Sequence, residues 1–320
     1  MLMPRENLFH SIQLLEYLSQ KEYDQINALQ ALCQANDQTN LKLELDYKLH
    51  VGIIAKSSSN KINEFLYYIG ETLVAYLGIS CFGGNIGEIN GMTHPAWRRN
   101  RLFQRLFALA ANECMHRDYS KILLLSDGKS DSGINFIKSI GGRYSNSEYR
   151  MKLGHNANFE ASNSITLRIA EKKDRKEIAR QNSLFFDDIP EIEDPSNEKC
   201  NPSEESSQNA EGTNLFDEDA PNTFTYMVEL SGKSIGKINV EYGNNSAFIF
   251  GFGILQDYRG KGYGKAALKE TLGILQAKDI TDVQLDVVCT NSNALGLYQA
   301  CGFEEVSIMN YYQYHLLELK

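Results

Sequence analysis

One internal repeat at a constant spacing constrains this fold more than any other feature of the sequence. Two stretches, 88–144 and 249–305, share the same order of apolar runs, charged loops and glycines. Identical residues anchor the repeat at an offset of 161, with no gap between them: Arg98 and Arg259, then Gly141 and Gly302. Because the chain has 320 residues and a domain typically takes about 150, the offset indicates a duplication. We expect two α/β domains, 1–157 and 158–320.

Hydrophobic periodicity gives each copy the order strand, tight loop, helix, strand, loop, helix and strand. The apolar run 248–255 predicts a buried strand, and the helix after the next loop has an apolar stripe at i, i+4 and i+7. The stripe is retained in both copies: Leu268, Leu272 and Leu275, and at the same offset Phe107, Ala111 and Cys114. Upstream strands and helices are also expected: strands 64–70, 72–80, 224–230 and 233–242, and helices 19–35 and 171–185. Ser130 and Asn291 suit N-caps of the last helices, which end at glycines.

The charge of the chain is unevenly distributed. There are 41 acidic and 32 basic residues, a net charge of −9. The segment 187–222 holds twelve acidic residues, one basic residue and four of the six prolines, which predicts a long irregular loop. The remainder of the chain is nearly neutral. Neither part has the basic surface that nucleic acid selects, so we expect no nucleic-acid partner.

Membrane, secreted and metal-dependent classes do not fit the sequence. No apolar run approaches the roughly 18 residues of a spanning helix, and the first residues lack the apolar core of a signal peptide. The six cysteines and six histidines are scattered without a metal-ligand spacing such as CxxC or HExxH. We therefore expect a cytoplasmic protein with reduced thiols, no metal site and no membrane partner.

A glycine-rich loop, Arg259–Lys265, follows the buried strand and opens a helix. Such a loop presents unpaired backbone N–H groups and the positive end of a helix dipole to an anion. A Walker A loop needs GxxxxGK followed by Ser or Thr, whereas Gly260 and Gly264 are one residue too close and Ala266 follows the lysine. The dinucleotide fingerprint GxGxxG would need a glycine in place of Lys265. Both familiar phosphate loops are therefore excluded.

The loop resembles the Arg/Gln-x-x-Gly-x-Gly/Ala loop of the GCN5-related N-acetyltransferase (GNAT) superfamily. It reads Arg259-Gly260-Lys261-Gly262-Tyr263-Gly264 in this chain. A second GNAT pattern, Asn-x-x-Ala-x-x-Leu-Tyr-x-x-x-Gly-Phe, is matched at each fixed position: Asn291, Ala294, Leu297, Tyr298, Gly302 and Phe303. The resemblance covers the second half and, through the duplication, extends to the first. It implies two tandem GNAT-like domains, each with a mixed, central, splayed β-sheet flanked by helices.

The resemblance also implies an acetyl-CoA-dependent N-acetyltransferase, an acyltransferase of the EC 2.3.1 type. In this family an amine attacks the acetyl thioester directly, and two parallel strands, here the apolar run and 282–289, splay to hold it. Tyr298 is the implied proton donor for the leaving thiolate. Pantetheine is expected to pair with the backbone of three residues of the first strand: Gly253, Ile254 and Leu255. The other implied cofactor-binding residues are Arg259, Gly260, Lys261, Gly262, Tyr263, Gly264, Lys265, Asn291 and Ala294.

The motifs leave the acceptor and the general base open. Small amines, amino acids, aminoglycosides and peptide amines all remain candidate acceptors. A carboxylate is the usual base, and Glu229, Glu241 and Asp286 lie on expected strands whose faces the sequence does not fix. Asn291 could either cap a helix or contact the cofactor. Cys289 could either be a buried structural thiol or line the cofactor slot. The acidic loop is either a solvated insertion or part of a pocket for a cationic amine.

The first copy departs from the motifs where the chemistry would need them. Arg99, Arg101 and Phe103 take the three glycine positions, and Ile137 takes the position of Tyr298. We therefore expect a degenerate N-terminal domain that supports the fold or the acceptor, with the active site in the C-terminal domain. The alternative is a GNAT-fold module that binds acyl-CoA or scaffolds a partner without turnover, against which the intact tyrosine argues.

Overall fold

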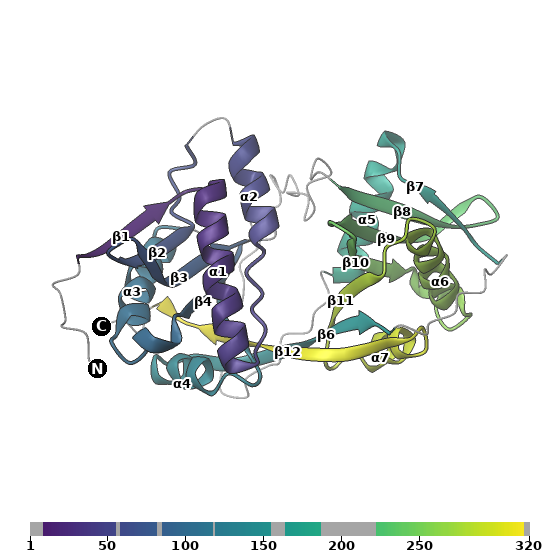
Figure 1. Cartoon of the computed structure of the whole chain (residues 1–320). Helices are drawn as coiled ribbons and strands as arrows, with labels where there is room; N and C mark the ends of the chain where they lie inside the picture. Colours follow the sequence, from purple (N-terminus) through teal and green to yellow (C-terminus); the bar gives the residue numbers. More distant parts are fainter. Residues whose placement is uncertain are drawn as a thin grey trace, which may run out of the picture. The chain divides into compact units, whose positions relative to one another are not determined.

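The chain forms two compact units in the computed structural model (Figure 1). The described residues are 9–55, 58–81, 85–117, 119–154, 164–186 and 222–316. Unit 1 comprises Met1–Met151, Asp286–Leu295 and Glu305–Lys320, and unit 2 comprises Lys152–Leu285 and Gly296–Glu304. The acidic loop expected over 187–222 lies almost entirely outside the described residues.

Unit 1 is built on strands in the order β1-β2-β3-β4-β5-β12-β6. Its strands are β1 (His10–Leu15), β2 (Glu64–Ile69), β3 (Thr72–Ser80), β4 (Ile86–Thr93), β5 (Lys121–Asp127), β6 (Arg143–Leu153) and β12 (Phe303–Tyr314). Its helices are α1 (Gln20–Asp37), α2 (Leu45–Ile54), the short η1 (Pro95–Trp97), α3 (Leu102–Met115) and α4 (Asp131–Ser139). Strands β1 to β4 are antiparallel neighbours, and β4 and β5 are parallel.

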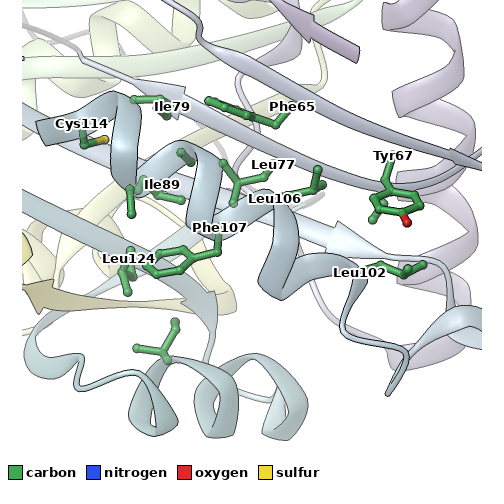
Figure 2. Close-up of a cluster of buried hydrophobic side chains, with 14 of the residues drawn as sticks. Phe65, Tyr67, Leu77, Ile79, Ile89, Leu102, Leu106, Phe107, Cys114 and Leu124 are labelled. Carbon is green, nitrogen blue, oxygen red and sulfur yellow. The ribbon is translucent and has the colours of Figure 1, made fainter. Parts of the chain in front are cut away.

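The main core of unit 1 lies between α3 and the sheet. Figure 2 shows Leu106, Phe107 and Cys114 of α3 directed toward Leu77 and Ile89 of the strands. All five side chains are buried. The expected apolar stripe of the first copy is therefore confirmed, and burial of this stripe is what holds the helix on the sheet.

Unit 2 has the strand order β11-β10-β9-β8-β7. Its strands are β7 (Thr166–Ile169), β8 (Thr223–Leu230), β9 (Lys233–Tyr242), β10 (Ser246–Ile254) and the first four residues of β11 (Asp282–Val288). Its helices are η2 (Lys172–Asp174), α5 (Arg175–Phe186), η3 (Gln256–Tyr258), α6 (Tyr263–Gln276) and the second half of α7 (Ser292–Gln299). The stripe of α6, Leu268, Leu272 and Leu275, is buried as expected.

Most expected elements are present, and the α/β class with a mixed sheet flanked by helices is confirmed. The hairpin between β8 and β9 turns at Ser231 and Gly232, which both have positive φ. Gly141 and Gly302 have φ of +92° and +89°, as expected of glycines that end helices. Besides the short 3-10 helices η1 and η3, three elements were not expected from the sequence: β1, α2 and β7. β1 and β7 have only six and four residues, and such short strands carry weak periodic signals.

The closing strand β12 does not pair within the second half of the chain alone. Residues 309–314 of β12, which follow the second copy in sequence, pair antiparallel with residues 122–127 of β5 in the first copy. Unit 1 therefore includes 286–295 and 305–320. The boundary at 157/158 stays a prediction about the repeat in the sequence.

Two further findings concern the described part of the chain. None of its helices is long and apolar enough to cross a membrane. Nor do three or more of its His, Cys, Asp and Glu side chains gather in an arrangement that would hold a metal ion.

Candidate active site

In unit 2, β10 and β11 are paired over only part of their length. They pair in parallel over 246–249 and 282–285, although β10 continues to Ile254. On its other side β10 pairs antiparallel with β9, and the register shifts after Phe250. Gly251 has a φ of +54° at this bulge. Beyond the bulge, one edge of β10 has no strand partner among the described residues, which is the splay that the family resemblance implies.

The pairing with β9 decides which backbone groups of β10 face the open edge. The Leu255 N–H donates to the Ile235 carbonyl at 2.8 Å. Backbone groups alternate between the two edges of a strand, so Gly253 also faces β9, whereas Ile254 and Phe252 face the open edge. Of the three expected pantetheine contacts, Ile254 is the one directed that way. Phe252 was missed, because a period-two pattern does not reveal the phase of the pairing.

The glycine-rich loop between β10 and α6 leaves its outer surface open. Gly260 and Gly262 have φ of +73° and +82°, a region that favours glycine. A Cβ added at either position would meet no described atom within 4 Å. Gly262 is the N-cap of α6 and has no side chain to cap the first turn, and none of the described side chains accepts a hydrogen bond from the N–H groups there. These features together suit an anion.

Arg259 has a structural bond within this loop. Its Nε donates to the Ile254 carbonyl at 2.7 Å. In unit 1 the aligned Arg98 makes the same bond, from Nε to the Thr93 carbonyl at 3.0 Å. The bond therefore belongs to the fold of both loops, and any phosphate contact of Arg259 would use its terminal nitrogens.

Two lysines and two aromatic rings surround the loop. The Lys261 Nζ donates to the Asp257 carbonyl at 2.8 Å and lies 5.7 Å from the ring centroid of Tyr258. The rings of Tyr258 and Tyr263 are 6.4 Å apart. Lys265 lies in the first turn of α6. The loop thus has positive side chains beside its uncapped N–H groups.

Tyr298 is buried on α7, close to the start of α6. Its neighbour Leu297 lies 3.5 Å from the position of a Cβ on Gly264. Tyr298 is 8% exposed, and its ring lies edge-on to Phe303, with centroids 6.0 Å apart. Burial raises the pKa of Tyr298 to about 12. The phenol is therefore protonated at neutral pH, which is the form that a proton donor needs.

Asn291 and Ala294 contact each other at the start of α7. The Asn291 Oδ1 accepts a hydrogen bond from the Ala294 N–H at 3.1 Å, so the cap that the sequence suggested is confirmed. Both residues belong to unit 1, as does Cys289, whose thiol pKa is raised by burial. A cofactor contact for any of the three stays a prediction.

The three candidate bases differ in how they are bound. Glu229 accepts from the Arg168 Nε at 2.6 Å. Asp286, in unit 1, is held by two bonds from Arg150, at 2.6 and 2.9 Å. Burial would raise the pKa of Asp286, but the bonds with Arg150 lower it. Glu241 lies on β9 in unit 2, four residues from Lys237 and therefore on the same face of the sheet.

Lys237 is a buried lysine beside the bulge, and the sequence analysis did not consider it. It is 0% exposed, and its Nζ donates to the Gly251 carbonyl at 2.9 Å. Burial lowers the pKa of Lys237 to about 8. Asn239 lies on the same face, and its Nδ2 is 2.6 Å from the position of a Cβ on Gly251. A lysine inside an otherwise apolar run of β9 was the available signal.

Helix α5 covers β10 on the face of the sheet that carries the Lys237 side chain. A Cβ on Gly253 would overlap the ring of Phe185, so the close approach of α5 requires glycine at this position. The acidic segment follows α5 directly in the sequence. Its expected contribution to an acceptor pocket lies outside the described residues and stays a prediction.

Comparison with known sequences identifies the relatives of unit 2. Residues 186–303 match the acetyltransferase (GNAT) family. An uncharacterized N-acetyltransferase of Bacillus subtilis, YycN, is 36% identical over 69 residues, which are 22% of this chain and 44% of that protein. The [ribosomal protein bS18]-alanine N-acetyltransferase of Escherichia coli is 32% identical over 69 residues, or 21% and 47% of the two chains. The chain thus spans about half the length of these relatives.

Comparison with solved structures covers the whole chain. A GCN5-related N-acetyltransferase from Sphaerobacter thermophilus superposes with a TM-score of 0.68 at 14% identity, covering 96% of both chains. A tandem GNAT protein from the clavulanic acid biosynthesis pathway also gives 0.68, at 13% identity, covering 96% of this chain and 99% of that one. At such identities the likeness shows the fold alone.

Proposed function

The chain belongs to the GNAT acetyltransferase superfamily, and from this premise we propose an acetyl-CoA-dependent N-acetyltransferase with its active site in unit 2. The open edge of β10, next to an uncapped glycine loop, is the observation that carries the proposal. Unit 1 has arginines where that loop has glycines, and we propose that it is degenerate. We place the reaction in the cytoplasm, as the composition predicts.

The loop and strand offer complementary contacts to acetyl-CoA. The pyrophosphate would accept hydrogen bonds from the N–H groups at the start of α6, with Lys261 and Lys265 near its charge. The pantetheine arm would extend along the open edge of β10, where Phe252 and Ile254 direct their backbone groups. The acetyl carbonyl would then lie between the splayed strands.

The transfer step needs one acid and one base. The amine nitrogen forms a bond to the acetyl carbon as the carbonyl electron pair moves to oxygen. When this intermediate collapses, the C–S bond breaks and the sulfur takes the proton of Tyr298, whose raised pKa keeps it protonated beforehand. The proton of the amine goes to a carboxylate, directly or through water. Glu241 is our candidate for this base, since it shares the Lys237 face of β9.

The acceptor is proposed to be a small-molecule or peptide amine. The E. coli relative is named for the alanine of a ribosomal protein, which makes a peptide N-terminus one candidate. The acidic segment, with twelve acidic residues to one basic, favours an acceptor with additional positive charge. It follows directly after Phe185, which touches β10 at Gly253.

Release of thiol from acetyl-CoA across a panel of amines tests this proposal. The panel should contain polyamines, aminoglycosides, amino acids and short peptides with free N-termini, and calorimetry should measure acetyl-CoA binding in parallel. We expect binding, and thiol release with at least one cationic amine. Binding without thiol release for any amine would instead support a module that holds acyl-CoA without turnover. Absence of binding at millimolar acetyl-CoA would contradict both functions.

A further inference from the structure

The buried ammonium of Lys237 is more than the β10 bulge requires. A bulge leaves a carbonyl without its ladder partner, and here the Gly251 carbonyl accepts from the Lys237 Nζ. A neutral amide could satisfy the same carbonyl, and Asn239 lies within reach of Gly251. Removing an ammonium from water costs far more than removing an amide. The Gly251 carbonyl alone therefore does not account for the charge of Lys237.

The orientation of one peptide unit connects this charge to the open edge. The peptide between Gly251 and Phe252 is trans, so its carbonyl and its N–H point in opposite directions. Lys237, on β9, holds the carbonyl through its side-chain Nζ. Gly253 pairs with Lys237, and neighbouring residues of a strand direct their backbone groups to opposite edges, so the Phe252 N–H faces the edge of β10 that the described part of β11 leaves unpaired.

We propose that Lys237 is a positioning residue for acetyl transfer, which acts through the Gly251–Phe252 peptide on the oxygen of the acetyl carbonyl. A cation bonded to a peptide carbonyl polarises that peptide and makes its N–H a stronger donor. The Phe252 N–H then stabilises the oxyanion that forms as the amine attacks. Lys237 itself gives up no proton, since Tyr298 protonates the sulfur. This role rests on the proposed function.

Unit 1 lacks both parts of this arrangement. Its strand β4 pairs with β3 without a register shift. Met92, at the repeat offset from Gly253, pairs with Tyr76, whereas Gly253 pairs with Lys237. A neutral phenol thus replaces the ammonium in the copy that has lost the glycine loop. The bulge and the lysine occur together, in the unit to which we assign catalysis.

Four variants of the full chain separate charge, hydrogen bond and fold. Lys237→Gln keeps a donor without the charge, Lys237→Met removes both, and Lys237→Arg keeps both. Lys278→Met, an exposed lysine of unit 2, is the matched control. Thiol release at saturating substrates gives kcat, calorimetry gives the Kd for acetyl-CoA, and thermal unfolding reports the fold.

We expect kcat to fall about 10- to 100-fold for the Gln and Met variants, as for other groups that act through a neighbour, with the Kd changed less than about twofold. The Arg variant should recover part of the loss, and the control should match wild type. A Gln variant with wild-type kcat would overturn the role of the charge, even if the Met variant fails to fold. A Gln variant that loses kcat and acetyl-CoA affinity equally would reduce Lys237 to a structural role. A wild-type chain that releases no thiol with any amine would overturn the proposed function, and this role with it.

Discussion

The two strand-to-helix loops of the repeat share a backbone conformation but present different surfaces. Gly260 and Gly262 have φ of +73° and +82°, and at the same offset Arg99 and Arg101 have φ of +65° and +58°. A left-handed conformation costs a residue other than glycine roughly 1–2 kcal/mol. Unit 1 has kept the shape of the loop despite this cost. The glycines of unit 2 are therefore explained by what approaches the loop, rather than by its fold.

The splay between parallel strands shows a second difference. In unit 1, β4 and β5 pair over 86–89 and 121–124 and then separate. The segment between α1 and α2 bonds to both strands beyond that point. The Asn40 N–H donates to Asp127 Oδ2 at 2.8 Å, and Asn90 Nδ2 donates to the Lys42 carbonyl at 2.7 Å. The duplicated fold supplies the splay, and the chain of unit 1 occupies it.

The largest effect is expected from Gly262→Arg, which gives unit 2 the residue found at the aligned position of unit 1. The fold should tolerate the change, because Arg101 already has this backbone conformation. The side chain would cover N–H groups that we assign to pyrophosphate, and bonds to a charged group are worth about 1.5–3 kcal/mol each. Calorimetry should show acetyl-CoA binding weakened by about 100-fold or more. The melting temperature should fall by only a few degrees, because the left-handed conformation costs an arginine roughly 1–2 kcal/mol. Unaltered binding would refute our assignment of this loop.

Tyr298→Phe should lower kcat by about 100-fold, because a positioned acid contributes 10²–10⁴-fold, and should leave acetyl-CoA affinity nearly unchanged. The aligned residue in unit 1, Ile137, has no such group. Tyr144→Phe, at an exposed tyrosine of unit 1, is the control. The Tyr298 hydroxyl keeps its proton below its pKa, which burial raises to about 12. The wild-type rate should therefore show no decrease that is due to deprotonation of Tyr298 at any pH below 10. A Phe variant with unchanged kcat would exclude Tyr298 as the acid.

Sequence reasoning reached the elements that depend on local pattern. The apolar stripes, the helix-ending glycines Gly141 and Gly302 and the loop Arg259–Lys265 each have a signal within a few residues. The separation of β10 and β11 was also predicted, but only from the resemblance to a family. The pairing of β12 with β5 and the bulge at Gly251 depend on which strand edges meet in the fold, and no local period encodes that choice. Lys237 was missed for the same reason, since its importance depends on the bulge opposite it.

A smaller effect is expected on the pH dependence of stability in unit 1, where Glu88 lies on one of the two splayed strands. Burial raises the pKa of Glu88 on β4 to about 7. A carboxyl group has a pKa near 4.5 when unfolded, so between pH 4.5 and 7 the folded state binds more protons, and stability falls as pH rises. The loss should be about 2–3 kcal/mol across this window. Urea unfolding of Glu88→Gln should remove this dependence, and an unchanged pH profile would show that Glu88 is solvated.

The smallest expected effect is that of Arg101→Gly, which returns the aligned glycine to unit 1. Glycine adopts the φ of +58° without steric cost, but it also loses more entropy on folding, so a net gain of about 0.5–1 kcal/mol is expected. Arg101 makes no side-chain bond that caps α3, so no cap is lost. Turnover and the stoichiometry of acetyl-CoA binding should stay unchanged, because Asn40 and Lys42 still occupy the splay. A second binding event in calorimetry would show that the arginine alone closes unit 1, and would make the two units alternative sites.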